Sequence, residues 1–193
     1  MDRVIHNIAD HTSLKNYQLL MSLVVPRPIA WVSTYNEDGS VNLAPYALFA
    51  VVSTEPPIVQ FASRQPKDSY RNATQRGAFV VNFAHTGQQP AVALTSQPLA
   101  YGESEAEAAG LECLKAPNVD APMVVGCRAA LECSTYDTAT VGGSVVTYGL
   151  VETVHIDPSI IAEDGLADFA RLDPLSKLGR NEWGRTEAFR QQS

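Results

Sequence analysis

The feature that most constrains this chain is a tight turn signal between two strand-like segments. Residues 29–35 and 40–43 are rich in apolar and β-branched side chains, and the turn sequence Asn-Glu-Asp-Gly lies between them at residues 36–39. An Asp-Gly pair in this setting is typical of a β-hairpin, because glycine adopts the positive φ that such turns need. Residues 42–47 are small and interrupted by Pro45, so we expect them to leave the sheet and to present bare backbone to a flat ligand.

The rest of the chain has the pattern of a mainly β protein with peripheral helices. We expect further strands over residues 47–53, 58–62, 78–83, 123–133 and 144–156, with a flexible loop over 134–143. Helices are expected over residues 14–23, 69–75 and 90–95, and residues 101–111 fit either a helix or an irregular excursion. The segment 78–83 is apolar throughout, which is typical of a strand buried on both faces.

Composition excludes several classes of function. The chain has 193 residues, which favours a single domain over 1–193 with a proper core. Its formal net charge of −7 argues against a nucleic-acid surface, because such a surface needs a basic patch. The apolar runs are too short for a membrane span and the N-terminus lacks the pattern of a signal peptide, so we expect a cytoplasmic protein.

No metal site is expected in this sequence. The three cysteines have neither Cys-x-x-Cys spacing nor a nearby histidine, so reduced structural thiols are favoured at Cys113, Cys127 and Cys133. His155 ends a predicted strand, where a structural role is favoured over catalysis.

No catalytic acid or base is expected either. The alternating acidic residues favour a solvated face over acid–base chemistry at Glu103, Glu105 and Glu107. The sequence also holds no Ser/His/Asp, Cys/His or paired-carboxylate pattern.

The start of the predicted helix 69–75 has the composition of an anion site. Asp68 is a suitable N-cap, and Gly77 stands where a helix commonly ends. Free backbone N–H groups and the positive end of the helix dipole are expected at residues 68–71, with Lys67 just before them and the Ser69 hydroxyl among them. An anion is therefore favoured at this position.

Arg27 is a second candidate cation, at the start of the first predicted strand. Pro26 and Pro28 force an extended backbone around Arg27. Arg27 is either a plain surface arginine or a cation that faces an anionic cofactor or substrate.

Several segments together carry a resemblance that covers nearly the full length. They are residues 27–34, 42–46, 67–69, 77–82, 104–112 and 148–155, and in order and spacing they resemble the flavin reductase-like family of FMN-binding split β-barrels. The resemblance implies a homodimer that holds one flavin per subunit near the interface. This chain departs from the family at two positions near its C-terminus, where Lys177 and Trp183 stand in place of the usual arginine and tyrosine.

The resemblance also suggests which residues bind the cofactor, FMN, with FAD left open. Ser33 and Thr34 would join Lys67 and Ser69 at the phosphate, although ordinary strand hydroxyls remain the alternative. The small residues of 42–47 would leave backbone groups free for the isoalloxazine ring. The complete set of expected cofactor-binding residues is Arg27, Ser33, Thr34, Asn42, Ala44, Pro45, Tyr46, Ala47, Lys67, Asp68 and Ser69.

The function implied is an NAD(P)H-dependent flavin reductase that transfers a hydride from NAD(P)H to bound flavin. A monooxygenase or another redox protein would be its partner. The alternative is a flavoredoxin-like FMN electron carrier that does not itself oxidise NAD(P)H, and a third is a split barrel without flavin. No GxGxxG sequence is present, so the nicotinamide donor would stack on an exposed flavin face.

Overall fold

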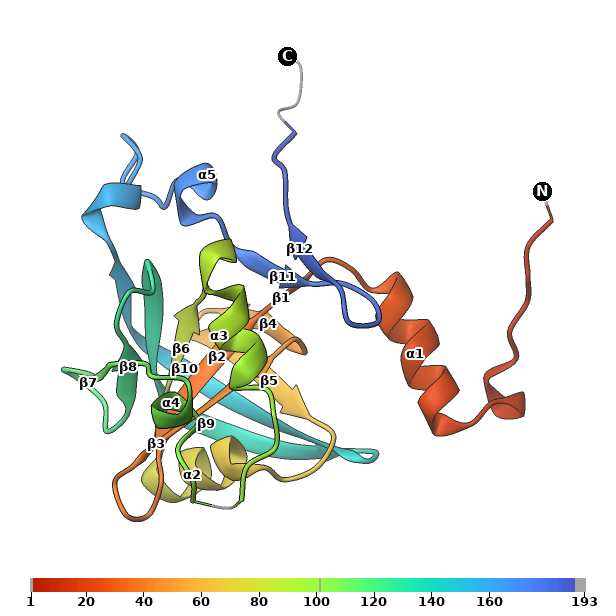
Figure 1. Ribbon diagram of the computed structural model, residues 1–193, viewed down its shortest axis with the longest axis horizontal. Helices are drawn as coiled ribbons and strands as arrows, with labels where there is room; N and C mark the ends of the chain where they lie inside the picture. The colour runs from red at the N-terminus through yellow and green to blue at the C-terminus, as the bar shows by residue number, and fades with distance from the viewer. Residues whose placement is uncertain (1, 101, 190–193) are drawn as a thin grey trace.

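The computed structural model describes residues 2–100 and 102–189, and its centre is a seven-stranded antiparallel sheet (Figure 1). Across the sheet the strands are β3 (Val41–Tyr46), β2 (Ala30–Tyr35), β6 (Ala78–Phe83), β9 (Ala129–Val141), β10 (Ser144–Ile156), β5 (Pro57–Ser63) and β4 (Phe49–Thr54). Within the described residues the edge strands β3 and β4 do not pair with each other, so the sheet is not closed. The predicted mainly β split barrel with peripheral helices is confirmed.

Smaller elements surround this sheet. A three-stranded sheet has the order β1 (Arg27–Pro28), β11 (Leu175–Lys177) and β12 (Trp183–Arg185), and a two-stranded sheet joins β7 (Cys113–Lys115) to β8 (Pro122–Val124). The helices are α1 (Ser13–Leu23), α2 (Asp68–Arg76), α3 (Gln89–Leu94), α4 (Glu105–Ala108) and α5 (Phe169–Leu172), with short 3-10 turns at Ile8–Asp10, Thr86–Gln88 and Pro158–Ile160. Tyr101, part of the segment predicted over 101–111, lies outside the described residues, and α4 forms the helical part of that segment.

The core lies on both faces of the central strands. On one face Phe61 packs between Tyr46 and Phe79, at ring distances of 4.7 and 5.2 Å. On the other face the fully buried Trp31 donates a hydrogen bond to Thr95 just beyond α3 at 2.9 Å. β6 lies between β2 and β9 and is buried over five of its six residues, which confirms the prediction for 78–83.

The hairpin prediction is confirmed, but the prediction that residues 42–47 leave the sheet is wrong for residues 42–46. β2 and β3 pair from Ala30 opposite Tyr46 to Tyr35 opposite Val41, and Gly39 in the turn has a φ of 88°. Pro45 stays in the strand opposite Trp31. A proline is tolerated here because β3 is an edge strand. No strand of the described chain pairs with its outer side, so no ladder there needs the N–H that Pro45 lacks.

The predicted loop over 134–143 is also wrong, because these residues form the end of a long hairpin. β9 and β10 pair up to Val141 opposite Ser144, and Gly142 makes the turn with a φ of 58°. The threonines of this segment favour a strand, and each finds a partner in β10, as Thr138 does opposite Thr147. The predicted strand 123–133 is instead divided into β8 and β9 by a turn at Gly126, whose φ is 86°.

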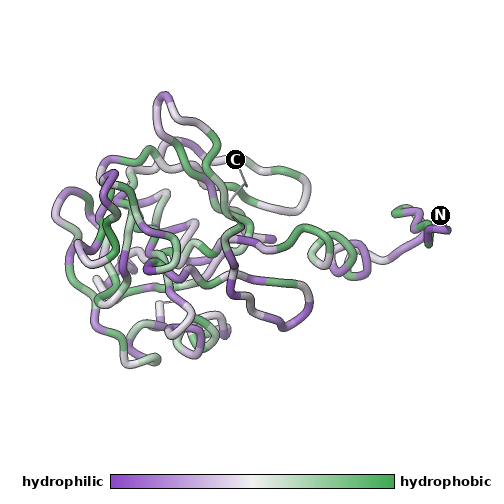
Figure 2. The backbone as a smooth tube through the Cα atoms, turned by 90° about the horizontal axis from the view of Figure 1, so that it is seen from above, coloured by the Kyte–Doolittle hydropathy of each residue, from purple (hydrophilic) through white to green (hydrophobic). Residues whose placement is uncertain are grey.

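Helix α1 projects away from the barrel (Figures 1 and 2). Thr12 caps it by accepting a hydrogen bond from the Lys15 N–H at 3.2 Å, as the predicted start requires. All of its residues are exposed or half-buried, and Leu20 and Leu23 keep 52% and 76% of their surface. An apolar helix face that the rest of its own chain does not cover is a candidate surface for contact with another protein chain.

Candidate functional site

A groove of about 1180 Å³ lies where α1, the three-stranded sheet, the β3–β4 connection and the start of α2 meet. Six basic side chains of the described chain line it, and no Asp or Glu of those residues does: Lys15, Arg27, Arg64, Lys67, Lys177 and Arg180. The protein as a whole has a net charge of −7. The groove therefore concentrates positive charge in an acidic protein, which favours an anionic ligand.

The structure brings five of the predicted cofactor-binding residues together in this groove. They are Arg27, Pro45, Tyr46, Ala47 and Lys67. The other six lie outside its lining: Ser33, Thr34, Asn42, Ala44, Asp68 and Ser69.

Three of those six form a buried polar network behind the groove. The Asn42 side chain donates to the Thr34 hydroxyl at 3.0 Å and to the Ser69 hydroxyl at 2.8 Å. Asn72 donates to the same Thr34 oxygen at 3.1 Å and to Asn36 at 2.8 Å. All five side chains are nearly or fully buried, so this network fixes the start of α2 against the hairpin.

Ser33 points to the opposite face of β2 from Thr34, as neighbouring strand residues must. Its hydroxyl donates to the Pro122 carbonyl at 2.6 Å and accepts from the Asn82 side chain at 2.9 Å. The structure therefore does not bring Ser33 and Lys67 to one surface.

The start of α2 is open at its backbone. The first hydrogen bond of the helix runs from the Arg71 N–H to the Lys67 carbonyl at 3.0 Å, which leaves the N–H groups of residues 68–70 outside the helical ladder. The N-cap is Lys67 rather than the predicted Asp68, and Asp68 instead pairs with Arg71 at 3.3 Å. Gly77 ends the helix in the left-handed conformation, as predicted.

Two buried polar atoms of the groove residues make no hydrogen bond of standard geometry among the described residues. The Tyr46 hydroxyl has the Ser69 hydroxyl as its neighbour, and burial raises the pKa of this phenol to about 12 although that neighbour opposes the rise. Arg27 donates from Nη1 to the Met21 carbonyl at 3.0 Å and from Nη2 to the Leu178 carbonyl at 2.8 Å, but its Nε is unpaired. Unpaired buried donors cost free energy, and a bound ligand can supply the missing acceptors.

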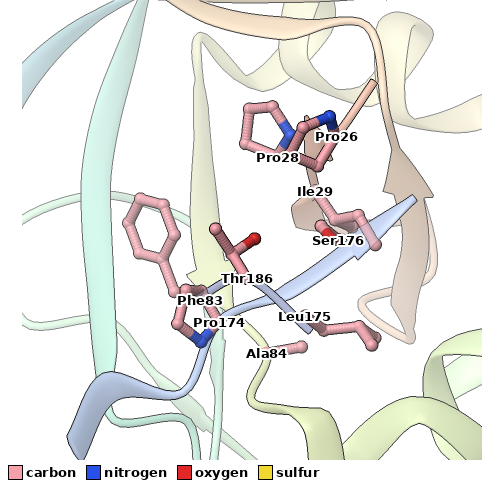
Figure 3. Close-up of a pocket in the computed structure, with 9 residues that line it drawn as sticks. All are labelled: Pro26, Pro28, Ile29, Phe83, Ala84, Pro174, Leu175, Ser176 and Thr186. Atoms are coloured by element: carbon pink, nitrogen blue, oxygen red, sulfur yellow. The ribbon is translucent and has the colours of Figure 1, made fainter. Parts of the chain in front are cut away.

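A smaller pocket of about 180 Å³ lies beside the three-stranded sheet (Figure 3), and Ile29 lines both this pocket and the groove. Arg27, Lys177 and Trp183 line the groove, whereas Pro28 and Ser176 line the pocket. The pocket is mainly apolar and also contains Phe83 and Leu175, as Figure 3 shows, among other residues. Its composition offers no cation for a phosphate group.

Two titratable side chains outside the groove have structural contacts. Glu105 departs from the predicted solvated face, because it is half-buried and accepts from the Leu43 N–H at 3.0 Å. Burial raises the pKa of this carboxyl. His155 hydrogen-bonds to Glu132, which also accepts from the Asn118 backbone at 2.8 Å; a structural role for His155 stays a prediction.

Neither a metal centre nor a membrane helix is found within residues 2–100 and 102–189. No group of three or more His, Cys, Asp or Glu side chains there could hold a metal ion. The helices there are too short or too polar to cross a bilayer. The three cysteines are free, and burial raises the pKa of Cys133 to about 12.

Sequence reasoning missed most of the cations in the groove. Arg64 lies in the connection between β5 and α2, and its guanidinium stacks on Tyr17 of α1 at 5.2 Å. Lys15 and Arg180 reach the groove from opposite ends of the chain. In the sequence, Lys177 stood out only because it differs from the residue that the family usually has at this position.

Comparison with known proteins points to one family. The family model described as "Flavin reductase like domain" matches residues 21–172. An uncharacterised protein of Halalkalibacterium halodurans is 34% identical over 181 residues, which cover 89% of this chain and 87% of that protein.

Two solved structures are similar over almost their whole length. Nitrilotriacetate monooxygenase component B from Bacillus cereus has a TM-score of 0.95 and 26% identity, with 100% of each chain covered. The 2-nitrobenzoate 2-nitroreductase from Pseudomonas fluorescens has a TM-score of 0.91 and 26% identity, covering 98% of this chain and 96% of that one. This chain therefore belongs to the flavin reductase-like family of split-barrel proteins.

Proposed function

We propose that this protein is an FMN-dependent, NAD(P)H-oxidising flavin reductase that binds its flavin in the cationic groove. One observation carries the proposal: six basic and no acidic side chains of the described chain line a groove of about 1180 Å³ beside an open helix start. The volume exceeds the roughly 300–1,000 Å³ typical of small-molecule sites. It therefore has room for a flavin and a second substrate.

The residues present fit FMN. Lys67 and the free N–H groups at residues 68–70 would hold the phosphate, because a helix start and an ammonium group both stabilise a dianion. The backbone of Pro45 and Ala47 would lie along the flat ring. FAD shares these groups, so FMN is the minimal ligand of the site.

In this proposal the flavin supplies the redox chemistry, and the chain supplies position and electrostatics. The groove holds no carboxylate from the described residues that could act as a general base, and hydride transfer requires none. The network of Asn42, Thr34 and Ser69 keeps the phosphate end rigid.

A redox partner and a second copy of the chain complete the proposal. One solved relative is component B of a monooxygenase, which supports a monooxygenase as the acceptor of reduced flavin. The family resemblance and the exposed leucines of α1 support a homodimer in which α1 packs on the partner copy. We also propose a cytoplasmic location.

The test begins with FMN added to the purified protein and the excess removed. Retained flavin bands that bleach under anaerobic conditions with NADH or NADPH support the reductase. Bands that persist with both nucleotides and bleach only with a reduced protein donor would identify an electron carrier instead. A protein that shows no FMN binding by equilibrium titration would contradict the flavin site.

A further inference from the structure

The three-stranded sheet aligns two cations and an indole ring in one row. Arg27 of β1 is directly opposite Lys177 of β11, and Lys177 is directly opposite Trp183 of β12. Residues that are directly opposite in a sheet point to the same face, so the three side chains form a row, and all three line the groove. The neighbouring row, Pro28 and Ser176, lines the small pocket instead.

The two cations of this row lack a carboxylate of their own. Within the described chain, neither Arg27 nor Lys177 forms an ion pair, and the Arg27 side chain is only 6% exposed. Burial and the charge of Arg27 both lower the pKa of Lys177, which Glu182 partly raises again. Two adjacent cations repel each other, and an anion between them would remove this repulsion.

The structural contacts of Arg27 do not explain why a second cation, Lys177, lies directly opposite it. Arg27 fixes α1 through the carbonyls of Met21 and Leu178, and this contact needs neither a second cation nor an open groove. Lys177 is different: its ammonium stands over the Trp183 ring at 4.3 Å and donates no hydrogen bond within the described residues. The cation–π contact holds Lys177 in place while its N–H donors remain free.

We propose that Arg27, Lys177 and Trp183 form an anion subsite for the second substrate of the groove, an aromatic compound that carries a carboxylate or phosphate group. The anionic group lies between Arg27 and Lys177: the Lys177 ammonium donates to it, and the buried Arg27 guanidinium attracts it through its charge. Trp183 offers an aromatic surface at the end of the row. The inference rests on the proposed function, since it names the substrate class of the same groove, but it concerns a different part of that groove from Lys67.

The test is calorimetric titration of the protein with benzoate and with benzamide, which have the same ring and differ in charge. Titrations are made with and without FMN, so the result does not depend on turnover. We expect benzoate to bind about 10-fold more tightly than benzamide, as one charge-assisted hydrogen bond would give. ADP-ribose is titrated in parallel, because its pyrophosphate tests whether the anion is that of the nicotinamide donor.

Lys177→Gln is the principal variant, because it removes the charge without touching a hydrogen bond of the fold. It is expected to weaken benzoate or ADP-ribose about 10-fold and to leave benzamide unchanged. Lys15→Gln is the matched control, since it removes a charge from the same groove outside the row. Arg27→Gln is a second variant, with circular dichroism to verify that α1 is retained.

The outcomes separate this inference from the proposed function. Loss of benzoate affinity alone in Lys177→Gln assigns the row to an aromatic carboxylate, and loss of ADP-ribose affinity alone assigns it to the donor. Equal affinities for benzoate, ADP-ribose and benzamide, or equal effects of Lys15→Gln and Lys177→Gln, would overturn the subsite. Failure of the protein to bind FMN while Lys177→Gln still weakens anion binding would overturn the proposed function and leave the subsite standing.

Discussion

The Asn42 side chain donates to the Ser69 hydroxyl at 2.8 Å and so joins the hairpin to the first turn of α2. The contact spans 27 residues of sequence and is fully buried, as both side chains are. It makes the geometry of the proposed phosphate site depend on the sheet rather than on α2 alone. A nine-residue helix is too short to be stable without such support.

Replacing Asn42 by Ala should destabilise the protein and weaken flavin binding together. The change leaves the Ser69 hydroxyl without its buried donor, at a cost of about 1–3 kcal/mol in the free energy of unfolding. Urea unfolding and FMN titration measure the two effects. Thr74→Ala, on the exposed side of α2, is the control, and an Asn42→Ala protein as stable as that control would contradict the role of the network.

Replacing Lys67 by Gln should weaken FMN binding without affecting stability. Lys67 is exposed and its side chain makes no cap hydrogen bond, so the folded protein loses little. A charge-assisted hydrogen bond to phosphate contributes about 1.5–3 kcal/mol, so the dissociation constant should rise at least about 10-fold. Lys115→Gln on β7 is the matched control, and an unchanged FMN affinity in Lys67→Gln would place the phosphate elsewhere.

Gly149→Ala should strongly destabilise the barrel. A Cβ at Gly149 would lie 2.3 Å from the Phe79 ring and 3.0 Å from the Cys133 side chain, and both residues belong to the core. Overpacking of this kind costs about 1–3 kcal/mol or more. Gly143→Ala adds a methyl group in open space at the tip of the same hairpin, and thermal unfolding of the two variants should differ accordingly.

Protonation of Glu132 should lower the stability of the folded protein at acidic pH. Burial opposes its charged form, but hydrogen bonds from His155 and Asn118 lower its pKa below the ordinary value of 4.5. Because the pKa is lower in the folded protein than in the unfolded chain, the stabilisation is present above about pH 4.5 and is lost as the pH falls through the folded value.

The corresponding variant is Glu132→Gln, measured by urea unfolding between about pH 3 and about pH 7, a range that brackets the ordinary pKa of 4.5. It should flatten the pH dependence at the acidic end, whereas Glu163→Gln at an exposed position should not. Parallel pH profiles for Glu132→Gln and the unmodified protein would show that this carboxyl does not contribute.

A charged residue on the outer face of α1 should dissociate the proposed dimer. Leu20 is 52% exposed and does not line the groove, so Leu20→Glu should block packing on a partner copy while leaving the groove intact. Sedimentation velocity should then give a monomer that still binds FMN. Leu114→Glu, at a leucine 55% exposed on β7, is the control, and a monomeric unmodified protein would refute the dimer.

The sequence by itself determined the local elements. The Asp-Gly turn, the start of α1 and the helix end at Gly77 each depend on a few neighbouring residues, and all three are as predicted or close to it. Errors arose where a local signal opposed a long-range pairing. Pro45 remains in a strand because β3 is an edge, and residues 134–141 form a strand because β10 lies beside them.

Only the tertiary structure decided which side chains share a surface. Ser33 and Thr34 are adjacent in sequence, yet the pleat of β2 sends their hydroxyls to opposite faces. Arg27 and Lys177 are 150 residues apart, yet the register of β1 on β11 sets them directly opposite each other. Local propensity fixes turns and caps within a few residues, whereas the composition of a surface depends on strand order and register, which are set by packing of the whole chain.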